Sequence, residues 1–439
     1  MSNTAIIAFL VAIMMSIVMH LSWRLRFIFF LAFIFLSLAK LPINIGFITE
    51  QTLRLPLAII LLMSGYKDVV NSIYKPLNPF SLLFLLLWTI YISVVWSISS
   101  EKLPQDLYEY IGNLIFFVIV VVYMQRMNSR EFKILLIFIV LTRIPGLLIN
   151  IPSVRYILER IGFYWGTTYH QAAGHSSVSL LPFLLLGVST ASKLRYKLLI
   201  WGLIAVTFYI VVDSGARSPA LLFGLVLILW WRKIRYGIVV AVVILVAFQF
   251  YMSSMKTDTT EERYQRLFSV ISTGDVTEAH NVEFRYDHLV YGFRALAKEP
   301  LFGHGYTSWS NIVGEEVGQI GYLTAPHNEP LRILVEYGVF GFSLFALFIY
   351  NCINKLKKKP SKDFWVTLSY AFFLAIVSHI AVNIFHNSLL SRYFFFICAV
   401  GSILPSILYR LEQDDISHKQ RFKKPEMPSG NGKRNSIHD

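Results

Sequence analysis

Charged residues are scarce in this chain. Asp, Glu, Lys and Arg make up only 15% of its 439 residues, whereas 55% are hydrophobic and 15% are aromatic. A soluble domain needs more polar residues to cover its surface, so this composition excludes an ordinary soluble protein. Apolar runs near the 20 residues needed to cross a bilayer recur along the chain, for example at 80–98, 236–252 and 364–382. We therefore predict an all-α polytopic membrane protein.

Cysteine is almost absent as well. The two cysteines, Cys352 and Cys398, fall in or beside apolar segments, which excludes a disulfide framework and a cysteine-based metal site. The histidines His170 and His175 show no HExxH or similar metal-binding pattern. We predict no metal and no cofactor, and we expect the cysteines to be packing residues.

Twelve or thirteen transmembrane helices are predicted, because one of the weak early segments, 25–41 or 52–66, does not necessarily cross. The first segment, 4–20, lacks the basic start and cleavage site of a secretory signal, so we expect it to be retained. The predicted spans are 4–20, 25–41, 52–66, 80–98, 107–124, 131–149, 176–191, 196–212, 217–231, 236–252, 330–353, 364–382 and 388–409.

Lys and Arg concentrate in every second connection between these spans. Since basic residues stay on the cytoplasmic side, this alternation predicts a cytoplasmic C-terminus and an external position for the long loop that starts at residue 253. The formal charge of +14 is thus mainly a topology signal, and nucleic-acid binding is not expected.

The chain is predicted to divide into four parts. They are a bundle of about ten spans at 1–252, a large external loop at 253–329, further transmembrane helices at 330–409, and a tail at 410–439. The tail is polar and rich in Pro and Gly, so we expect it to be disordered.

An amphipathic helix is predicted inside the long loop, over residues 282–298. Phe284, Leu289, Phe293, Leu296 and Ala297 recur there at roughly helical spacing. Such a helix is expected to lie on the membrane surface, and the Pro and Gly of the following EPLFGHG segment are expected to end it.

His327 and Asn328 stand where the long loop returns to the membrane. Asn328 is a good helix N-cap, and Pro330 is tolerated in a first helical turn. One interpretation is simply a helix start. The other is that a base or proton donor stands at a helix N-terminus, where the helix dipole and free N–H groups also favour an anion.

Three arginines draw attention for different reasons. Arg217 is unusual at an outer helix mouth, where it either pairs with Asp213 or aims its guanidinium at phosphate. Arg285 opens the predicted loop helix beside acidic residues, where a solvated surface charge is the simpler interpretation. Arg143, inside an apolar run, is either buried and functional or extended toward the membrane surface.

Several stretches together resemble the O-antigen ligase and polymerase (WaaL and Wzy type) superfamily. They are SGARSPALLFGLVL, then FRYDHLVYGFRALAKEPLFGHG, then PHNEPLRILVEYGVFGF, with a looser similarity at GTTYHQAAGHSSVSLLPFLLL. The resemblance covers about residues 165–345. It implies a multi-pass protein of the bacterial inner membrane with a GT-C-like glycosyltransferase architecture and a periplasmic active site.

This resemblance also implies a reaction and its residues. The family moves a glycan from undecaprenyl diphosphate to a sugar hydroxyl, without a metal and with inversion at the anomeric carbon. Arg217 and Arg285 are then expected to bind the diphosphate and His327 to act on the acceptor hydroxyl. Asn328, Arg332, His170 and His175 are the residues that we expect to contact substrate.

Two classes of acceptor are compatible with this resemblance. A ligase receives lipid A core, whose phosphates favour a basic outer surface. Residues 253–326 instead hold six Lys and Arg against ten Asp and Glu, a net charge of −4. This favours a polymerase of surface-polysaccharide repeat units, working with a chain-length regulator.

Two other classes of protein fit the hydropathy. A transporter or flippase of lipid-linked sugars places ionisable groups near the bilayer midplane, whereas here the candidate charges cluster at the outer mouths. A purely structural membrane protein predicts that Arg217 and His327 are dispensable for any function.

Overall fold

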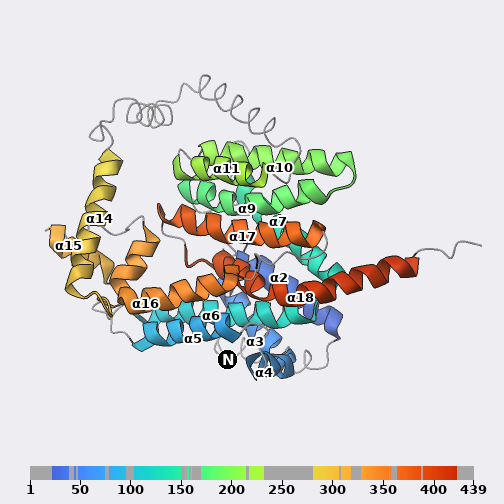
Figure 1. Ribbon diagram of the computed structural model, residues 1–439, viewed down its shortest axis with the longest axis horizontal. Coiled ribbons are helices and arrows are strands. Elements are labelled where there is room, and N and C mark those ends of the chain that lie inside the picture. The colour runs from blue at the N-terminus through green and yellow to red at the C-terminus, as the bar shows by residue number, and fades with distance from the viewer. Residues whose placement is uncertain are drawn as a thin grey trace, which may run out of the picture.

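The computed structural model shows an α-helical bundle of long, mostly parallel rods (Figure 1). The structure describes residues 22–38, 44–45, 48–74, 79–94, 103–149, 154, 156–157, 160, 170–213, 217–231, 280–305, 308–317, 328–354, 356, 363–386 and 389–422. All structural statements below concern these residues.

The helices follow the apolar runs of the sequence. They are α2 (Trp23–Leu38), α3 (Glu50–Ser64), α4 (Tyr66–Tyr74), α5 (Pro79–Val94), α6 (Leu103–Arg126), α7 (Ser129–Ile149), α9 (His170–Thr190), α10 (Leu194–Asp213), α11 (Arg217–Trp231), α14 (His280–Lys298), α15 (Trp309–Val317), α16 (Glu329–Asn354), α17 (Asp363–Asn383) and α18 (Arg392–Phe422). Two short antiparallel strands, β1 (Asn44–Ile45) and β2 (Ile48–Thr49), precede α3.

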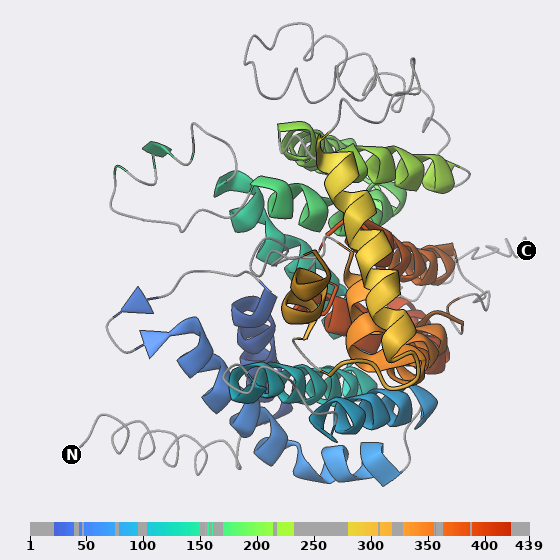
Figure 2. The ribbon, with the colours of Figure 1, turned by 90° about the vertical axis from the view of Figure 1, so that its left-hand side faces the viewer.

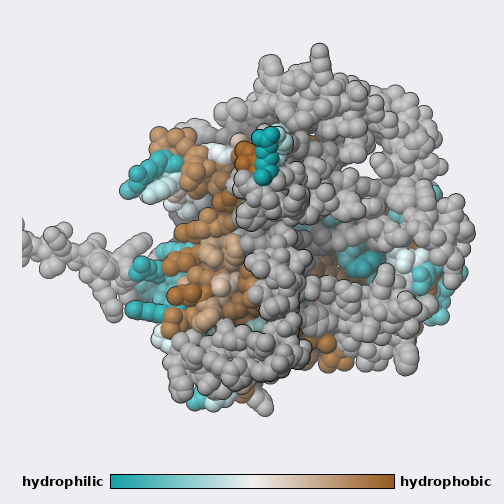
Figure 3. All heavy atoms as spheres, turned by 180° about the vertical axis from the view of Figure 1, so that it is seen from behind, coloured by the Kyte–Doolittle hydropathy of each residue, from teal (hydrophilic) through white to brown (hydrophobic). Residues whose placement is uncertain are grey.

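The prediction of an all-α polytopic membrane protein is confirmed. Four helical segments are long and apolar enough to cross a bilayer, at Leu194–Val212, Glu329–Asn354, Phe364–Asn383 and Arg392–Asp414, and several shorter apolar helices lie beside them. The predicted spans coincide with helices, except 4–20 and 236–252, which lie outside the described residues. Figure 3 shows apolar side chains gathered over a broad band of the rear face.

Contacts between helix ends fix the direction of the helices in the bundle. Arg410, far along α18, donates a hydrogen bond of 3.0 Å to the carbonyl oxygen of Met127 between α6 and α7. At the other end, Asn113, in the first half of α6, donates one of 3.3 Å to the carbonyl of Leu390, just before α18. Because α16 also begins there, beside α14, we call this the α14 end of the bundle.

A dense aromatic core lies close to the α14 end. Trp88 of α5 meets Tyr110 of α6 edge-on at 5.5 Å and Tyr337 of α16 at 6.1 Å between ring centroids. Phe345 packs on the same indole at 4.8 Å. Edge contacts of this kind stabilise aromatic pairs beyond the area that they bury, so α5, α6 and α16 are held in a fixed relation.

A loop docks into a break in α16. At Gly338 the backbone leaves the helical region, with φ 66° and ψ −175°, a conformation that is essentially restricted to glycine. Backbone N–H groups of Val339 and Phe340 donate instead to the carbonyls of Pro300 and Leu301, at 2.9 and 3.1 Å. The carbonyls of Val335 and Glu336 in α16 accept hydrogen bonds from the backbone N–H groups of His304 and Gly305, so the loop replaces bonds that the kink breaks.

The close approach of two chain segments explains the glycines at this joint. A Cβ on Gly338 would lie 2.3 Å from the carbonyl oxygen of Leu301, and one on Gly303 would lie 2.4 Å from the backbone nitrogen of Gly338. Neither position has room for a side chain. The Pro and Gly of this segment end α14 at Lys298, as predicted.

The C-terminal helix is longer than predicted. Residues 410–422 continue α18 to Phe422, which corrects the expected disorder over that part of the tail. The segment contains Glu, Gln, Lys and Arg, which lose little side-chain freedom in a helix. Residues 423–439 lie outside the described part of the chain.

Candidate active site at the α14 end of the bundle

The start of α16 forms as the sequence predicts. The Oδ1 atom of Asn328 accepts a hydrogen bond of 3.0 Å from the backbone N–H of Leu331, and its carbonyl accepts one of 3.0 Å from Arg332. Asn328 is therefore the N-cap of α16. Pro330 falls in the first turn, where its missing N–H costs nothing. His327, the residue before this cap, lies outside the described residues.

Three charged residues gather in the first turns of α16. Glu329 and Glu336 are both 1% exposed, and Arg332 forms an ion pair with Glu329. Glu336 also lies close enough to interact electrostatically with Arg332. Two buried carboxylates thus share one guanidinium, and the ionised cluster carries a net negative charge. The Oε2 atom of Glu329 has no hydrogen-bond partner among the described residues, so it is available to a donor.

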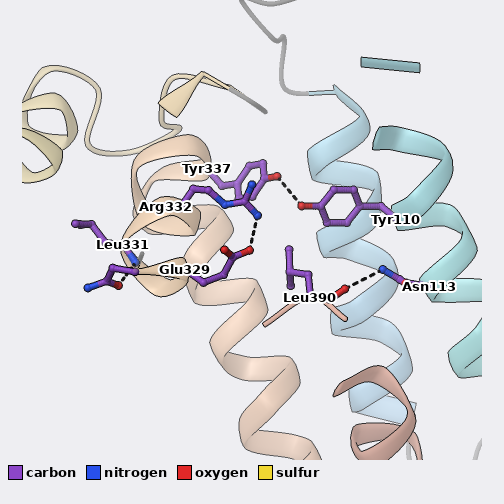
Figure 4. Close-up of polar contacts among 8 residues, drawn as sticks. Tyr110, Asn113, Glu329, Leu331, Arg332, Tyr337 and Leu390 are labelled. Atoms are coloured by element: carbon purple, nitrogen blue, oxygen red, sulfur yellow. Dashed lines mark hydrogen bonds and ion pairs between the residues drawn. The ribbon is translucent and has the colours of Figure 1, made fainter. Parts of the chain in front are cut away.

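Two tyrosines complete this cluster, as Figure 4 shows. The hydroxyl groups of Tyr110 on α6 and Tyr337 on α16 lie 3.3 Å apart, beside Arg332. Tyr91 of α5 donates hydrogen bonds to the carbonyls of Phe302 and Tyr337, at 2.8 and 2.9 Å. Helices α5, α6 and α16 and the docked loop therefore hold one polar group of residues in place.

Helix α14 crosses the ends of the bundle helices instead of running along them (Figures 1 and 2). Helix α14 therefore runs crosswise to the long bundle helices. Arg285 lies in its first half, although the structure describes only its helical position. The ring of His304 hydrogen-bonds at 2.7 Å to the carbonyl of Ala295, tying α14 to the docked loop.

Helix α14 packs on the protein through a face other than the one that carries its larger apolar residues. His288, Gly292 and Ala295 face inward, whereas Leu289 and Phe293 are 38% and 55% exposed. The side chain of Phe284 lies outside the described part, Leu296 is partly buried and Ala297 is exposed.

Small residues let α14 approach its neighbours closely. A Cβ on Gly292 would lie 2.8 Å from Leu331 and 2.9 Å from the indole of Trp309. Packing against α15 and α16 therefore selects the face with the least bulk, and the larger apolar residues point outward.

The helices that carry the other predicted residues begin at the same end. Near their other ends, Trp230 of α11 donates a hydrogen bond of 3.3 Å to Ser189 of α9, so these two helices are parallel. Helix α11 starts at Arg217 and α9 starts at His170, with His175 in its second turn. For these three residues the structure describes the helical position alone.

Sequence patterns missed several members of the cluster. Glu329 lies three residues before Arg332 and Glu336 lies four residues after it, which is visible in the sequence. Nothing local indicates that the two glutamates are buried. Tyr110 is contributed by a helix more than 200 residues away in the chain. Only the fold brings it to α16.

The chemistry open to this cluster follows from its groups. Carboxylates and phenol hydroxyls accept and donate hydrogen bonds to hydroxyl-rich ligands, and a net negative charge favours a neighbouring base in its protonated form. Within the described ranges, no three His, Cys, Asp or Glu residues gather as metal ligands do.

One comparison with known proteins bears on this end of the bundle. Residues 201–346 match the model of a protein family described as O-antigen ligase. The matched range runs from α10 through α11, α14 and α15 to the kinked first part of α16. No curated protein matches the sequence.

Proposed function

We propose that this multi-pass membrane protein transfers a glycan from undecaprenyl diphosphate to a sugar hydroxyl, because residues 201–346 match the O-antigen ligase family. The proposal includes inversion at the anomeric carbon without a metal, on the outer side of the bacterial inner membrane. The observation that carries it is the family match over the helices that meet at the α14 end.

The donor diphosphate is assigned to two arginines. Arg217 begins α11 and Arg285 lies in α14, and guanidinium groups bind phosphate oxygens in pairs. As the anomeric bond breaks, the diphosphate gains negative charge. Cations placed there in advance stabilise the transition state more than the ground state, which raises the rate.

His327 is assigned to the acceptor hydroxyl. A histidine at this point can take the hydroxyl proton near neutral pH as the oxygen attacks the anomeric carbon. The net negative charge of Glu329, Arg332 and Glu336 supports this role, because it stabilises the imidazolium that results. Asn328, as the N-cap, fixes where the chain enters α16, and so supports the position of its neighbour.

The other predicted substrate contacts take different forms. Arg332 is paired with the buried Glu329, so we assign it to holding that carboxylate and only through it to the acceptor. His170 and His175, in the first turns of α9, are assigned to the glycan.

We propose polymerisation of repeat units as the reaction, with lipid-linked glycan as acceptor and a chain-length regulator as partner. The net charge of −4 over residues 253–326 supports this, because it disfavours the phosphates of lipid A core. Ligation to lipid A core is the second candidate, which the description of the matched family favours.

A reconstituted assay tests both candidates. The purified protein is given an undecaprenyl-diphosphate-linked repeat unit, with or without lipid A core, and the products are read by mass spectrometry. A ladder of repeats without core establishes a polymerase. A single transfer that requires core establishes a ligase. Movement of the lipid-linked sugar across liposomes without a new glycosidic bond would contradict both and indicate a transporter.

Variants test the assigned residues in the same assay. We expect Arg217→Ala, Arg285→Ala and His327→Ala to abolish transfer while membrane abundance stays near wild type. Arg217→Lys is also expected to be poor, because an ammonium group does not reproduce the two-pronged contact. Arg130→Ala is the matched control and should retain activity. Arg130 is exposed and lies at the start of α7, away from the α14 end of the bundle.

A further inference from the structure

A lone arginine lies between three helices of the bundle. The guanidinium of Arg143, on α7, stacks over the ring of Tyr393 on α18 at 4.1 Å from the centroid. Tyr393 is 4% exposed, and its hydroxyl donates a hydrogen bond of 2.8 Å to the carbonyl of Ser179 on α9. Helix α7 packs against both α9 and α18. The tyrosine is thus fixed, and it presents its ring face to the arginine.

This arginine lies toward the α14 end of the bundle. Helix α7 begins at Ser129, beside the opposite end, where Arg410 binds the connection from α6. At a rise of about 1.5 Å per residue, Arg143 lies roughly 21 Å along α7. In an apolar layer about 30 Å thick, this depth corresponds to the outer third. Tyr393, the second residue of α18, gives the same placement.

The charge of Arg143 is not neutralised by the described part of the protein. Tyr393 is the one titratable group with which it interacts there, and no carboxylate pairs with it. Its Nε atom is buried without a hydrogen-bond partner among the described residues. A guanidinium in an apolar layer is costly, and a ring face offsets only part of that cost. The residue is only partly covered by the described part of the protein.

We propose that Arg143 on the ring of Tyr393 is a binding site for a lipid-borne phosphate or diphosphate. The ligand's negative charge supplies the missing counterion. Its phosphate oxygens accept hydrogen bonds from the guanidinium N–H groups that the ring face leaves free. That the ligand is the glycan donor rests on the proposed function.

The register of α9 places a second polar residue on the helix face that carries Ser179. His175 stands one helical turn before Ser179, on the same face of α9 and closer to the α14 end. A phosphate held at Arg143 therefore has its attached glycan directed toward the helix starts that carry the predicted catalytic residues.

Binding of farnesyl diphosphate, a short prenyl diphosphate, tests the site in the full-length protein purified in dodecyl maltoside. Affinity is measured by calorimetry, and thermal stability is measured with and without the ligand. We expect Arg143→Met to bind the probe at least about tenfold more weakly, which is the scale of one lost charge-assisted contact. Without ligand, this variant should be as stable as wild type or more so, because an unneutralised charge has been removed.

Further variants keep the test decisive. Arg130→Met, on the exposed cytoplasmic turn of α7, should bind the probe as wild type does. Arg143→Lys keeps a cation over the ring and should fold, with several-fold weaker binding. Unchanged affinity in either Arg143 variant overturns the proposal. A strongly destabilised Arg143→Met protein whose Lys counterpart binds normally would show a purely structural clamp.

Competition with phosphatidylglycerol distinguishes the two possible sources of the phosphate, which are the bilayer lipid and the glycan donor. If phosphatidylglycerol displaces the probe from wild type but not from Arg143→Met, the site serves bilayer lipid. If it does not compete, the site serves the donor diphosphate. Neither measurement needs an acceptor or turnover. A wild type that binds through Arg143 but forms no glycosidic bond would refute the proposed function alone, and transfer with unchanged probe affinity in Arg143→Met would refute this site alone.

Discussion

Removing Arg332 should destabilise the protein far more than removing its partner Glu329. Glu329 and Glu336 are each 1% exposed, and both lie close enough to Arg332 to interact electrostatically with its guanidinium. Arg332→Gln leaves two buried carboxylates without this guanidinium, and breaking a buried pair in this way costs about 3–5 kcal/mol. Glu329→Gln leaves Arg332 with Glu336 still beside it and a side chain that is 24% exposed, so we expect a loss of about 1–2 kcal/mol.

The double variant separates this pair from its surroundings. Glu329→Gln in the Arg332→Gln background removes the negative charge of one of the two buried carboxylates, so the combined loss should be smaller than the sum by about 1–3 kcal/mol. The free energy of unfolding is measured in mixed micelles of dodecyl maltoside and a denaturing detergent, with helicity followed by circular dichroism.

A less buried ion pair in the same molecule is the control. Asp68 pairs with Arg126, whose side chain is 51% exposed, at the end of the bundle away from α14. Arg126→Gln should cost about 1 kcal/mol or less. Equal losses for Arg332→Gln and Glu329→Gln, or strict additivity in the double variant, would refute the shared-guanidinium account.

Two further predictions concern the loop that docks into α16. Gly338→Ala should lower the free energy of unfolding by about 3 kcal/mol or more, because the backbone there is restricted to glycine and the added Cβ meets a carbonyl oxygen at 2.3 Å. The control is Gly202→Ala on α10, where an added Cβ has nothing within 4 Å. It should be neutral or slightly stabilising in the same unfolding assay. Tyr91→Phe removes the hydroxyl that bridges Phe302 and Tyr337, so we expect about 1–2 kcal/mol of destabilisation and faster proteolysis of the loop, and unchanged proteolysis would contradict that bridging role.

The helices could be predicted because their signals are local. Apolar runs of bilayer length stand between basic connections, and the described helices follow them. The N-cap at Asn328 and the stop after Lys298 also depend on a few neighbouring residues. Such signals survive in the fold because the membrane requires each spanning segment to satisfy its own backbone bonds.

The rest depends on contacts between distant segments. Nothing in EYGVFG marks a break in α16, since the kink exists only where residues 300–305 supply replacement hydrogen bonds. The face of α14 that packs on the protein could not be predicted, because the neighbours of Gly292 leave no room for bulkier side chains there. The sequence allowed two positions for the Arg143 side chain, either buried or extended toward the membrane surface. Its contact with Tyr393 on a remote helix decides between them.

Part of the candidate site stays a prediction. The described structure places the helix positions of Arg217 and Arg285 at one end of the bundle but not their side chains, and His327 lies outside it. What the structure adds is the charged cluster behind the cap of α16, which could not be predicted because burial is a property of the assembled bundle.

The joint at Gly338 also has a consequence for how the chain is inserted into the membrane during synthesis. The carbonyls of Val335 and Glu336 accept hydrogen bonds from His304 and Gly305, which leave the ribosome earlier than α16 does. An apolar helix delivered without that loop would place unpaired backbone groups in the lipid. The loop must therefore already be in place when α16 enters the membrane, so the positioning of the loop is a precondition for the helix that follows it.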